Sequence, residues 1–218
     1  MTAGKPTPAP AIRIRSATVD DAAGILAVYA PYVDTPITFE ESVPSLEEFS
    51  ARMVEIQAVY PCLAAVVDEP GPNGMRERIV GYACAHAQHP RAAYAWNAEL
   101  SVYLAPEARG RNLGGALYRA LIDLLRAQGI KAAHALVTVP NAPSERLHAS
   151  FGFQLVGVQE NAGYTCGSWH DVAWFVKPLA ACEDDPAPIL PFPALAAARP
   201  ETVREALGRA NASMDRRG

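Results

Sequence analysis

The stretch from residue 100 to residue 118 constrains the fold of this chain more than any other part of the sequence. Residues 100–104 alternate as in a strand, a basic turn containing glycine follows at 109–115, and leucines then recur on one face of a helix. Such a turn directs several backbone N–H groups to one point, at the positive end of the helix dipole. The pattern predicts an anion-binding loop. A plain surface turn with two solvated arginines, Arg109 and Arg111, is the alternative.

The other elements alternate between strand and helix patterns on both sides of this stretch. Strands are expected at 12–15, 62–67, 78–87, 133–139, 155–159 and 171–176, and helices are expected after cap patterns at Thr18, Ser45 and Asn141. The predicted order is β-α-α-β-β-β-α-β-α-β-β. Because several strands are apolar on both faces, helices must cover both sides of the sheet. We predict an α/β chain of the α+β type, built around a mixed central sheet.

The 218 residues fit one domain better than two. Residues 1–11 contain three prolines and indicate a flexible leader, residues 12–180 form the domain, and residues 181–218 form a tail rich in proline and alanine. Apolar residues spaced by three and four positions predict a short helix at 200–214 within that tail.

Composition excludes several classes of function. Nineteen basic and 23 acidic residues give a net charge of −4, which argues against a general nucleic-acid binder and against a protein held on anionic lipid. The four cysteines form no C-x-x-C pair and no His, Asp and Glu cluster has ligand spacing, so no metal is expected. The N-terminus lacks the apolar core of a signal peptide, and no segment is long and apolar enough to span a membrane. We therefore expect a cytoplasmic protein.

Two familiar nucleotide loops do not fit residues 109–115. A Walker loop needs Gly-Lys before Ser or Thr, and no lysine lies between Lys5 and Lys131. A dinucleotide fingerprint belongs in the first βα turn of a domain, whereas this loop lies in mid-chain. Residues 109–114, Arg-Gly-Arg-Asn-Leu-Gly, instead resemble the acyl-CoA loop of the GCN5-related N-acetyltransferase (GNAT) superfamily, (Gln/Arg)-x-x-Gly-x-(Gly/Ala). Asn112 replaces the first glycine of that pattern, and asparagine tolerates a positive φ better than most residues.

The resemblance extends from about Ile12 to Pro178. Residues 94–103, 141–148, 151–153, 163–164 and 167–172 are similar to motifs of the phosphinothricin / methionine sulfoximine acetyltransferase branch of this superfamily. The resemblance implies the GNAT fold with a mostly antiparallel sheet, acetyl-CoA as cosubstrate, a small-molecule amine as acceptor, no metal, and a homodimer.

In that family, backbone groups of the strand and loop hold the pantetheine arm and the pyrophosphate, and an asparagine side chain holds a pantetheine amide. The matching cofactor-binding residues in this chain are Val102, Tyr103, Leu104, Arg109, Gly110, Arg111, Asn112, Leu113, Gly114, Gly115, Asn141 and Ser144. Asn141 precedes Ala-Pro, so it could equally cap the next helix.

The resemblance also implies two catalytic residues. Glu99 matches the general base, which takes the proton of the amine directly or through water, and a glutamate ion-paired at a strand edge is the alternative. His148 stands where much of the superfamily has a tyrosine that protonates the departing CoA sulfur. The sequence leaves open whether His148 acts as an acid, a base or a structural residue.

The acceptor pocket follows from the same resemblance, with ordinary packing as the alternative for its aromatic members. Arg91 is expected to hold a carboxylate with its forked guanidinium. The predicted substrate-binding residues are Phe39, His89, Pro90, Arg91, Tyr94, Trp96 and Trp169.

These features together predict an N-acetyltransferase. Its expected acceptor is the α-amine of a small amino acid with an acidic side-chain mimic, such as phosphinothricin or methionine sulfoximine, which attacks the thioester directly. The alternatives are acetylation of a polyamine, an aminoglycoside or a protein N-terminus, and a non-catalytic module that senses acyl-CoA. Arg91 argues against a cationic acceptor, and the presence of both Glu99 and His148 favours an enzyme.

Overall fold

The computed structural model describes residues 11–71 and 74–215. The strands are β1 (Ile12–Ser16), β2 (Cys62–Gly71), β3 (Gly74–Ala87), β4 (Asn97–Leu104), β5 (Ala132–Val139), β6 (Gln154–Thr165) and β7 (Ser168–Pro178). The α-helices are α1 (Ala22–Val33), α2 (Leu46–Gln57), α3 (Leu113–Gln128), α4 (Ala142–Ser150), α5 (Phe192–Ala198) and α6 (Pro200–Asp215). The predicted order of elements through β7 is confirmed.

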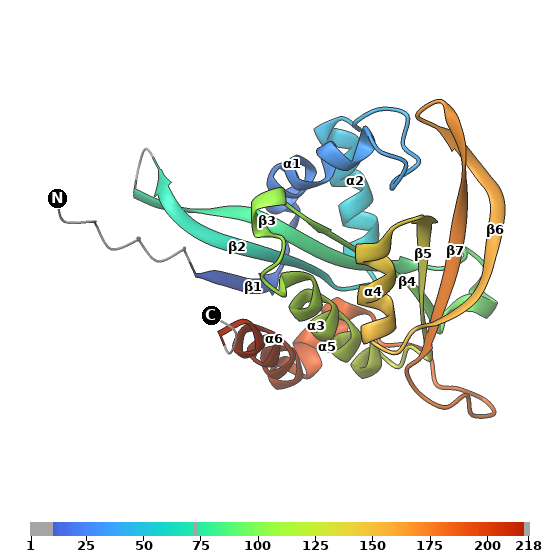
Figure 1. Ribbon diagram of the computed structural model, residues 1–218. Coiled ribbons are helices and arrows are strands. Elements are labelled where there is room, and N and C mark those ends of the chain that lie inside the picture. Colours follow the sequence, from blue (N-terminus) through green and yellow to red (C-terminus); the bar gives the residue numbers. More distant parts are fainter. Residues whose placement is uncertain (1–10, 72–73, 216–218) are drawn as a thin grey trace.

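The strands form one mixed sheet in the order β1-β2-β3-β4-β5-β7-β6, and every neighbouring pair is antiparallel except β4 and β5. Helices α1 and α2 cover one face, while α3, α5 and α6 cover the other, as predicted (Figure 1). The parallel pair β4–β5 is joined over only three positions, the last of which is Glu99 opposite His134. Beyond Glu99, therefore, the two strands diverge and leave one edge of β4 without a strand partner.

Helix starts follow the cap patterns of the sequence. Ser45 and Glu48 form a reciprocal capping box at α2, where the Glu48 N–H donates to Ser45 Oγ at 3.2 Å and the Ser45 N–H donates to Glu48 Oε2 at 2.8 Å. Asn141 Oδ1 accepts the N–H of Ser144 at 3.3 Å and so caps α4. Asn141 therefore caps this helix, and its contact with a pantetheine amide stays a prediction.

Both hairpins run further than the apolar patterns predict. Strands β2 and β3 extend as polar arms to Gly71 and Gly74, and residues 72–73 between them lie outside the described residues. Strands β6 and β7 meet at a two-residue turn whose central residues, Cys166 and Gly167, both have positive φ. Antiparallel pairing and cross-strand ion pairs such as Arg76–Glu69 support these arms, and hydrophobic periodicity does not report either contribution.

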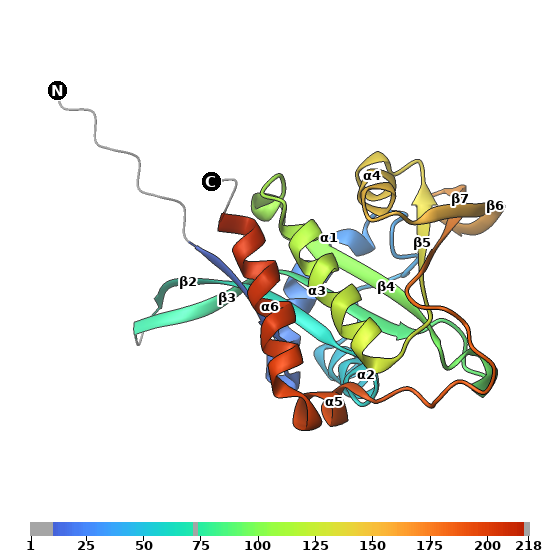
Figure 2. The ribbon, with the colours of Figure 1, turned by 90° about the horizontal axis from the view of Figure 1, so that it is seen from below.

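The core lies on both faces of the sheet, and the C-terminal residues contribute to it. Val203, Ala206 and Ala210 of α6 are buried, and α6 lies beside α3 in both views (Figures 1 and 2). The side chain of Asn211 accepts a hydrogen bond from the Ile14 N–H at 2.7 Å and donates one to the Ile14 carbonyl at 3.0 Å. These contacts fix α6 to β1. Most of the predicted leader, residues 1–10, and the last three residues of the tail lie outside the described residues.

Within the part of the chain that the structure describes, no helix combines the length and the hydrophobicity that crossing a membrane requires.

Candidate active site

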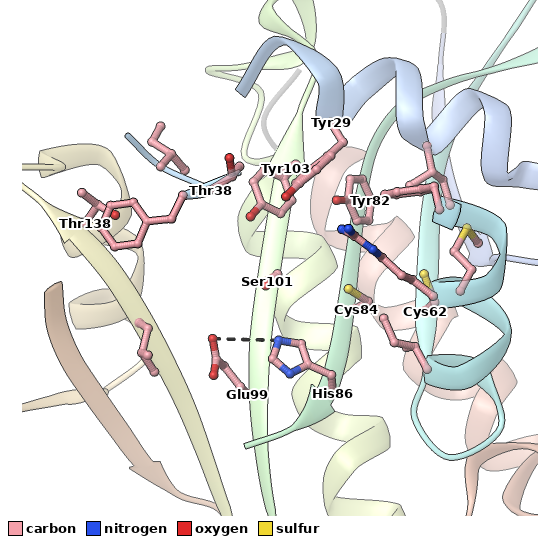
Figure 3. Close-up of a pocket in the computed structure, with 18 of the residues that line it drawn as sticks. Tyr29, Thr38, Cys62, Tyr82, Cys84, His86, Glu99, Ser101, Tyr103 and Thr138 are labelled. Carbon is pink, nitrogen blue, oxygen red and sulfur yellow. Dashed lines mark ion pairs between the residues drawn. The ribbon is translucent and has the colours of Figure 1, made fainter. Parts of the chain in front are cut away.

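A cavity of about 580 Å³ opens between the sheet and helices α1 and α2. Three pairs of directly opposed residues on β3 and β4 point into it: Tyr82 with Tyr103, Cys84 with Ser101, and His86 with Glu99. Every second residue of a strand faces the same side, so this alternation builds the cavity wall. Figure 3 shows His86 and Glu99 at one end of the wall, and Tyr82, Tyr103 and Tyr29 of α1 at the other.

Glu99 presents a carboxylate to this cavity without a hydrogen-bond partner among the described residues. Its side chain is 20% exposed, and His86 Nε2 lies 3.9 Å from its Oε1 as an ionic contact (dashed in Figure 3). Burial raises the pKa of the Glu99 carboxyl, and the charges of His86 and His89 oppose that shift. A carboxylate that burial makes more basic, with unused lone pairs facing a cavity, is suited to accept a proton.

The gap between β4 and β5 begins next to Glu99. The Ala105 N–H donates to the Val80 carbonyl at 2.9 Å, so the peptide groups of Ala105 face β3. In an antiparallel pair every second residue faces the same neighbour, so the peptide groups of Tyr103 also face β3. Those of Val102 and Leu104 point the other way, into the gap. The hydroxyl of Tyr32 accepts the Leu104 N–H at 3.2 Å and donates to the Leu104 carbonyl at 2.6 Å.

The loop before α3 has the geometry of an anion cradle. Gly110 and Asn112 both have positive φ, at 76° and 57°, so Asn112 adopts the backbone conformation that the missing glycine would have had. The first hydrogen bond of α3 runs from the Ala116 N–H to the Asn112 carbonyl, so the N–H groups of Leu113, Gly114 and Gly115 precede the helical ladder.

These two features fit a ligand that has a pyrophosphate and a peptide-like arm. The amides at the start of α3 suit the phosphates, and the strand edge facing the gap suits the amides of the arm. Arg109 lies in the loop and donates from Nη2 to the Tyr32 hydroxyl at 3.0 Å, and Arg111 lies in the same exposed loop. In the described part of the chain, no group of three His, Cys, Asp or Glu side chains could hold a metal ion.

His148 lies outside the cavity and is 4% exposed. Its Nδ1 lies 2.8 Å from the Ser144 carbonyl, which can only accept, so Nδ1 carries the proton. Its Nε2 lies 2.8 Å from the Tyr118 hydroxyl and therefore accepts a hydrogen bond from it. The ring stacks on Phe175 at 5.4 Å. Burial lowers the pKa of His148, and in this neutral state the imidazole has no accessible proton to give to a leaving thiolate.

Among the predicted acceptor residues, Phe39 lines the cavity. It has a positive φ of 54°, and its ring lies so close to Gly163 of β6 that a Cβ there would come within 2.7 Å of it. The structure does not bring the other six to the cavity lining. These are Pro90 and Arg91, exposed in the β3–β4 connection, His89 and Tyr94, whose rings pack at 4.6 Å, Trp96, bonded to the Ala187 carbonyl, and Trp169, which is 60% exposed beside Tyr164.

Several lining residues were not predicted from the sequence as acceptor-pocket residues. They include His86, Tyr29 and Arg52 of α2. Arg52 is one charged residue in a helix that also contains several solvated charges, so only the placement of α2 over the sheet identifies it. The alternation on β3 could have indicated His86, because it shares a face with Tyr82 and Cys84.

Comparisons with known proteins agree with this geometry. The family model "Acetyltransferase (GNAT) domain" matches residues 14–174, so the chain belongs to the GNAT acetyltransferase family. The matched region contains β4, the gap and the loop before α3.

Three of the similar proteins are acetyltransferases by name, and two of these names include a small-molecule substrate. An N-acetyltransferase of Streptomyces griseus is 40% identical over 77% of this chain and 86% of its own length. An L-methionine sulfoximine/L-methionine sulfone acetyltransferase of Pseudomonas paraeruginosa is 34% identical over 74% of this chain and 91% of its own. The crystal structure of a phosphinothricin acetyltransferase from Sinorhizobium meliloti in complex with AcCoA has a TM-score of 0.72 at 30% identity, covering 83% of this chain and 98% of that one. The protein is an N-acetyltransferase.

Proposed function

We propose that this enzyme transfers an acetyl group from acetyl-CoA to the α-amine of a small amino-acid-like acceptor of the phosphinothricin or methionine sulfoximine type. The observation that carries the proposal is the Glu99 carboxylate, which faces the cavity at the point where β4 and β5 diverge and has no hydrogen bond to any described residue. The names of the relatives support the class of acceptor.

In this proposal the loop at 109–115 and the edge of β4 position the thioester, and Glu99 prepares the amine. An ammonium group has a pKa near 10 and must lose a proton before it can attack. Glu99 accepts that proton, directly or through water, and the free amine attacks the thioester carbonyl. The C–N bond forms, the C–S bond breaks, and CoA leaves as a thiolate that takes up a proton. A peptide N–H in the gap, such as that of Val102, is placed to polarise the carbonyl oxygen.

Direct attack is favoured over an intermediate on Cys62. Cys62 and Cys84 line the cavity. The hydrogen bond with Cys84, together with burial, raises the pKa of the Cys62 thiol well above its usual value. A thiol that resists ionisation is a poor nucleophile, since the thiolate is the reactive form.

We further propose that His148 positions α4 against α3 through Tyr118 and does not donate a proton to the thiolate. The ring is neutral and both of its nitrogens are hydrogen-bonded, which supports this role. Asn141 and Ser144 contribute to the same helix start.

A thiol-release assay with acetyl-CoA tests the proposed function. The acceptors are phosphinothricin, methionine sulfoximine, a polyamine, an aminoglycoside and ordinary amino acids, and mass spectrometry identifies the product. Release with the first two and an N-acetylated product are expected. Release with only the polyamine or aminoglycoside would replace the proposed acceptor, and acetyl-CoA binding without any release would favour a sensing module.

We also propose a homodimer in the cytoplasm. The hairpin β6–β7 exposes Leu155, Val156, Val158, Tyr164 and Trp169, each 49–63% accessible, and exposed apolar side chains gathered on one hairpin suit a second copy of the chain. Sedimentation equilibrium tests the dimer: Trp169→Glu with Val156→Glu should shift the mass to that of one chain.

Cell fractionation tests the location, which is a prediction from the sequence.

A further inference from the structure

Few charged side chains line the cavity, and they lie at different ends of its β3–β4 wall. Within the described residues, the lining contains one guanidinium, Arg52, one carboxylate, Glu99, and one imidazole, His86. Glu99 and His86 form one opposed pair at one end of the β3–β4 wall. The position of Arg52 relative to this pair decides which part of a ligand each charge can bind.

Arg52 belongs to the opposite end. It pairs with Glu40, whose Oε1 lies 3.3 Å from the Tyr29 hydroxyl, and the Tyr29 ring packs edge-on against Tyr103 at 5.1 Å. Tyr103 lies four residues beyond Glu99 on β4, which is about 13 Å along the strand. These contacts place Arg52 toward the Tyr103 end of the wall, and Glu99 lies at the other end.

The Arg52 guanidinium is held in place and has donors to spare. Its Nη1 donates to Glu40 Oε1, and this is its one hydrogen bond within the described part of the chain. Guanidinium has five N–H donors in a planar fork, which match the two oxygens of a carboxylate, phosphinate or phosphonate. The side chain is 50% exposed, so a ligand can reach the remaining donors.

We propose that Arg52, held by Glu40, binds an anionic group at the distal end of the acceptor, while Glu99 receives the amine. This inference rests on the proposed function and sharpens its substrate class. An acceptor that contacts both groups must carry its acid group several bonds from the amine, as does the side-chain phosphinate of phosphinothricin. The α-carboxylate sits one carbon from the amine and is too close to Glu99 to reach Arg52. The proposal assigns to Arg52 the acid recognition that the sequence suggests for Arg91.

Two acceptors of nearly the same shape isolate the distal charge. Phosphinothricin has an anionic side-chain group, whereas L-methionine sulfoximine has an uncharged one, and both have the same α-amine and α-carboxylate. Because a hydrogen bond to a charged group at a half-exposed site is modest, Arg52→Gln should raise the KM for phosphinothricin about 10-fold. Its kcat should stay unchanged, since the contact is made equally in the ground and transition states. The KM for methionine sulfoximine should change less than about 2-fold, and Arg52→Lys should lie between.

Arg78→Gln is the matched control, because Arg78 is of similar exposure and pairs with Glu69 and Glu107 outside this cavity. Arg91→Gln tests the rival arginine. Equal losses for both acceptors in Arg52→Gln, no loss for either, or a selective loss in Arg91→Gln alone would overturn the proposal.

Calorimetric titration of phosphinothricin into the wild type and Arg52→Gln, each saturated with CoA, separates this inference from the proposed function. Tighter binding to the wild type by about 10-fold without thiol release would retain the anion site and reject the acetyl transfer. Equal binding would reject the anion site even if transfer occurs.

Discussion

Glu99 and His148 are both ionisable and both shielded from water, yet the structure holds them in opposite ways. Glu99 faces a cavity and has no hydrogen bond within the described ranges, 11–71 and 74–215, whereas both ring nitrogens of His148 are hydrogen-bonded and its ring packs among aromatic side chains. Burial moves both groups toward their neutral forms, because it raises the pKa of the acid and lowers that of the base. Only Glu99 keeps its titrating atoms within reach of a substrate. A shifted pKa therefore identifies a catalytic group only when the atom that titrates is also accessible.

The two sites also make opposite contributions to stability as pH changes. The raised pKa of Glu99 means that its contribution is fully present below its unfolded-state pKa and is lost as pH rises through the folded value. The lowered pKa of His148 means that its contribution is present above pH 6.5 and is lost as pH falls toward the folded value. If Glu99 is the base, the ionised form that the reaction needs is the form that burial disfavours.

The largest effect is expected for Glu99→Gln. Loss of the base should lower kcat by about 10²- to 10⁴-fold at pH 7, while the affinity for acetyl-CoA stays the same. The melting temperature at pH 8 should not fall, because a desolvated charge is removed. Glu107→Gln, an exposed ion-paired glutamate, is the control and should retain wild-type turnover. Unchanged turnover in Glu99→Gln would remove Glu99 as the base.

Tyr118→Phe should affect stability and leave the chemistry intact. Removing the hydroxyl leaves the buried His148 Nε2 without a donor, which should cost about 1–3 kcal/mol in the free energy of unfolding measured with urea. Turnover well below the melting temperature should stay within about 2-fold of wild type. A large loss of turnover in a variant of normal stability would mean that this pair takes part in the reaction.

The charge at the Arg52 end of the cavity should make the enzyme select between two acceptors. If Arg52 binds a distal anion, wild-type kcat/KM should be higher for phosphinothricin than for methionine sulfoximine by about 10-fold. Steady-state kinetics at equal acetyl-CoA checks this ratio. A ratio of one or below would show that the charge of the distal group does not select the acceptor.

The smallest effect concerns His86. Its charge lowers the pKa of Glu99, so His86→Gln should move the acidic midpoint of the kcat/KM profile to higher pH. His86 Nδ1 is 3.1 Å from the carbonyl of Ala87, so Nε2 is the nitrogen that faces Glu99. A midpoint that stays in place would show that His86 does not affect the pKa of Glu99.

Local signals predicted the elements and part of the site. The caps at Ser45 and Asn141 and the strand periods fixed most helix starts and strand positions, because these depend on neighbours in sequence. The positive φ of Asn112 followed from its place in the loop. Glu99 required the resemblance, since a glutamate at a strand edge is ordinary on its own.

Long-range packing decides the rest. Trp96 resembles a pocket aromatic, but its indole bonds to Ala187, which is 91 residues away. Arg52 enters the cavity only because α2 lies over the sheet. The surroundings of His148 come from α3, α4, β7 and the residue before β6, so no local pattern could show that both ring nitrogens would be occupied.

The pH dependence of kcat/KM for the wild type and Glu99→Gln, measured side by side with one acceptor, tests the role of Glu99 most directly. If Glu99 is the base, the variant should depend on amine that is already deprotonated in solution. Its rate should then rise about tenfold per pH unit up to the pKa of the acceptor, while the wild-type profile levels off at lower pH. Two parallel profiles that differ by a constant factor would contradict the account.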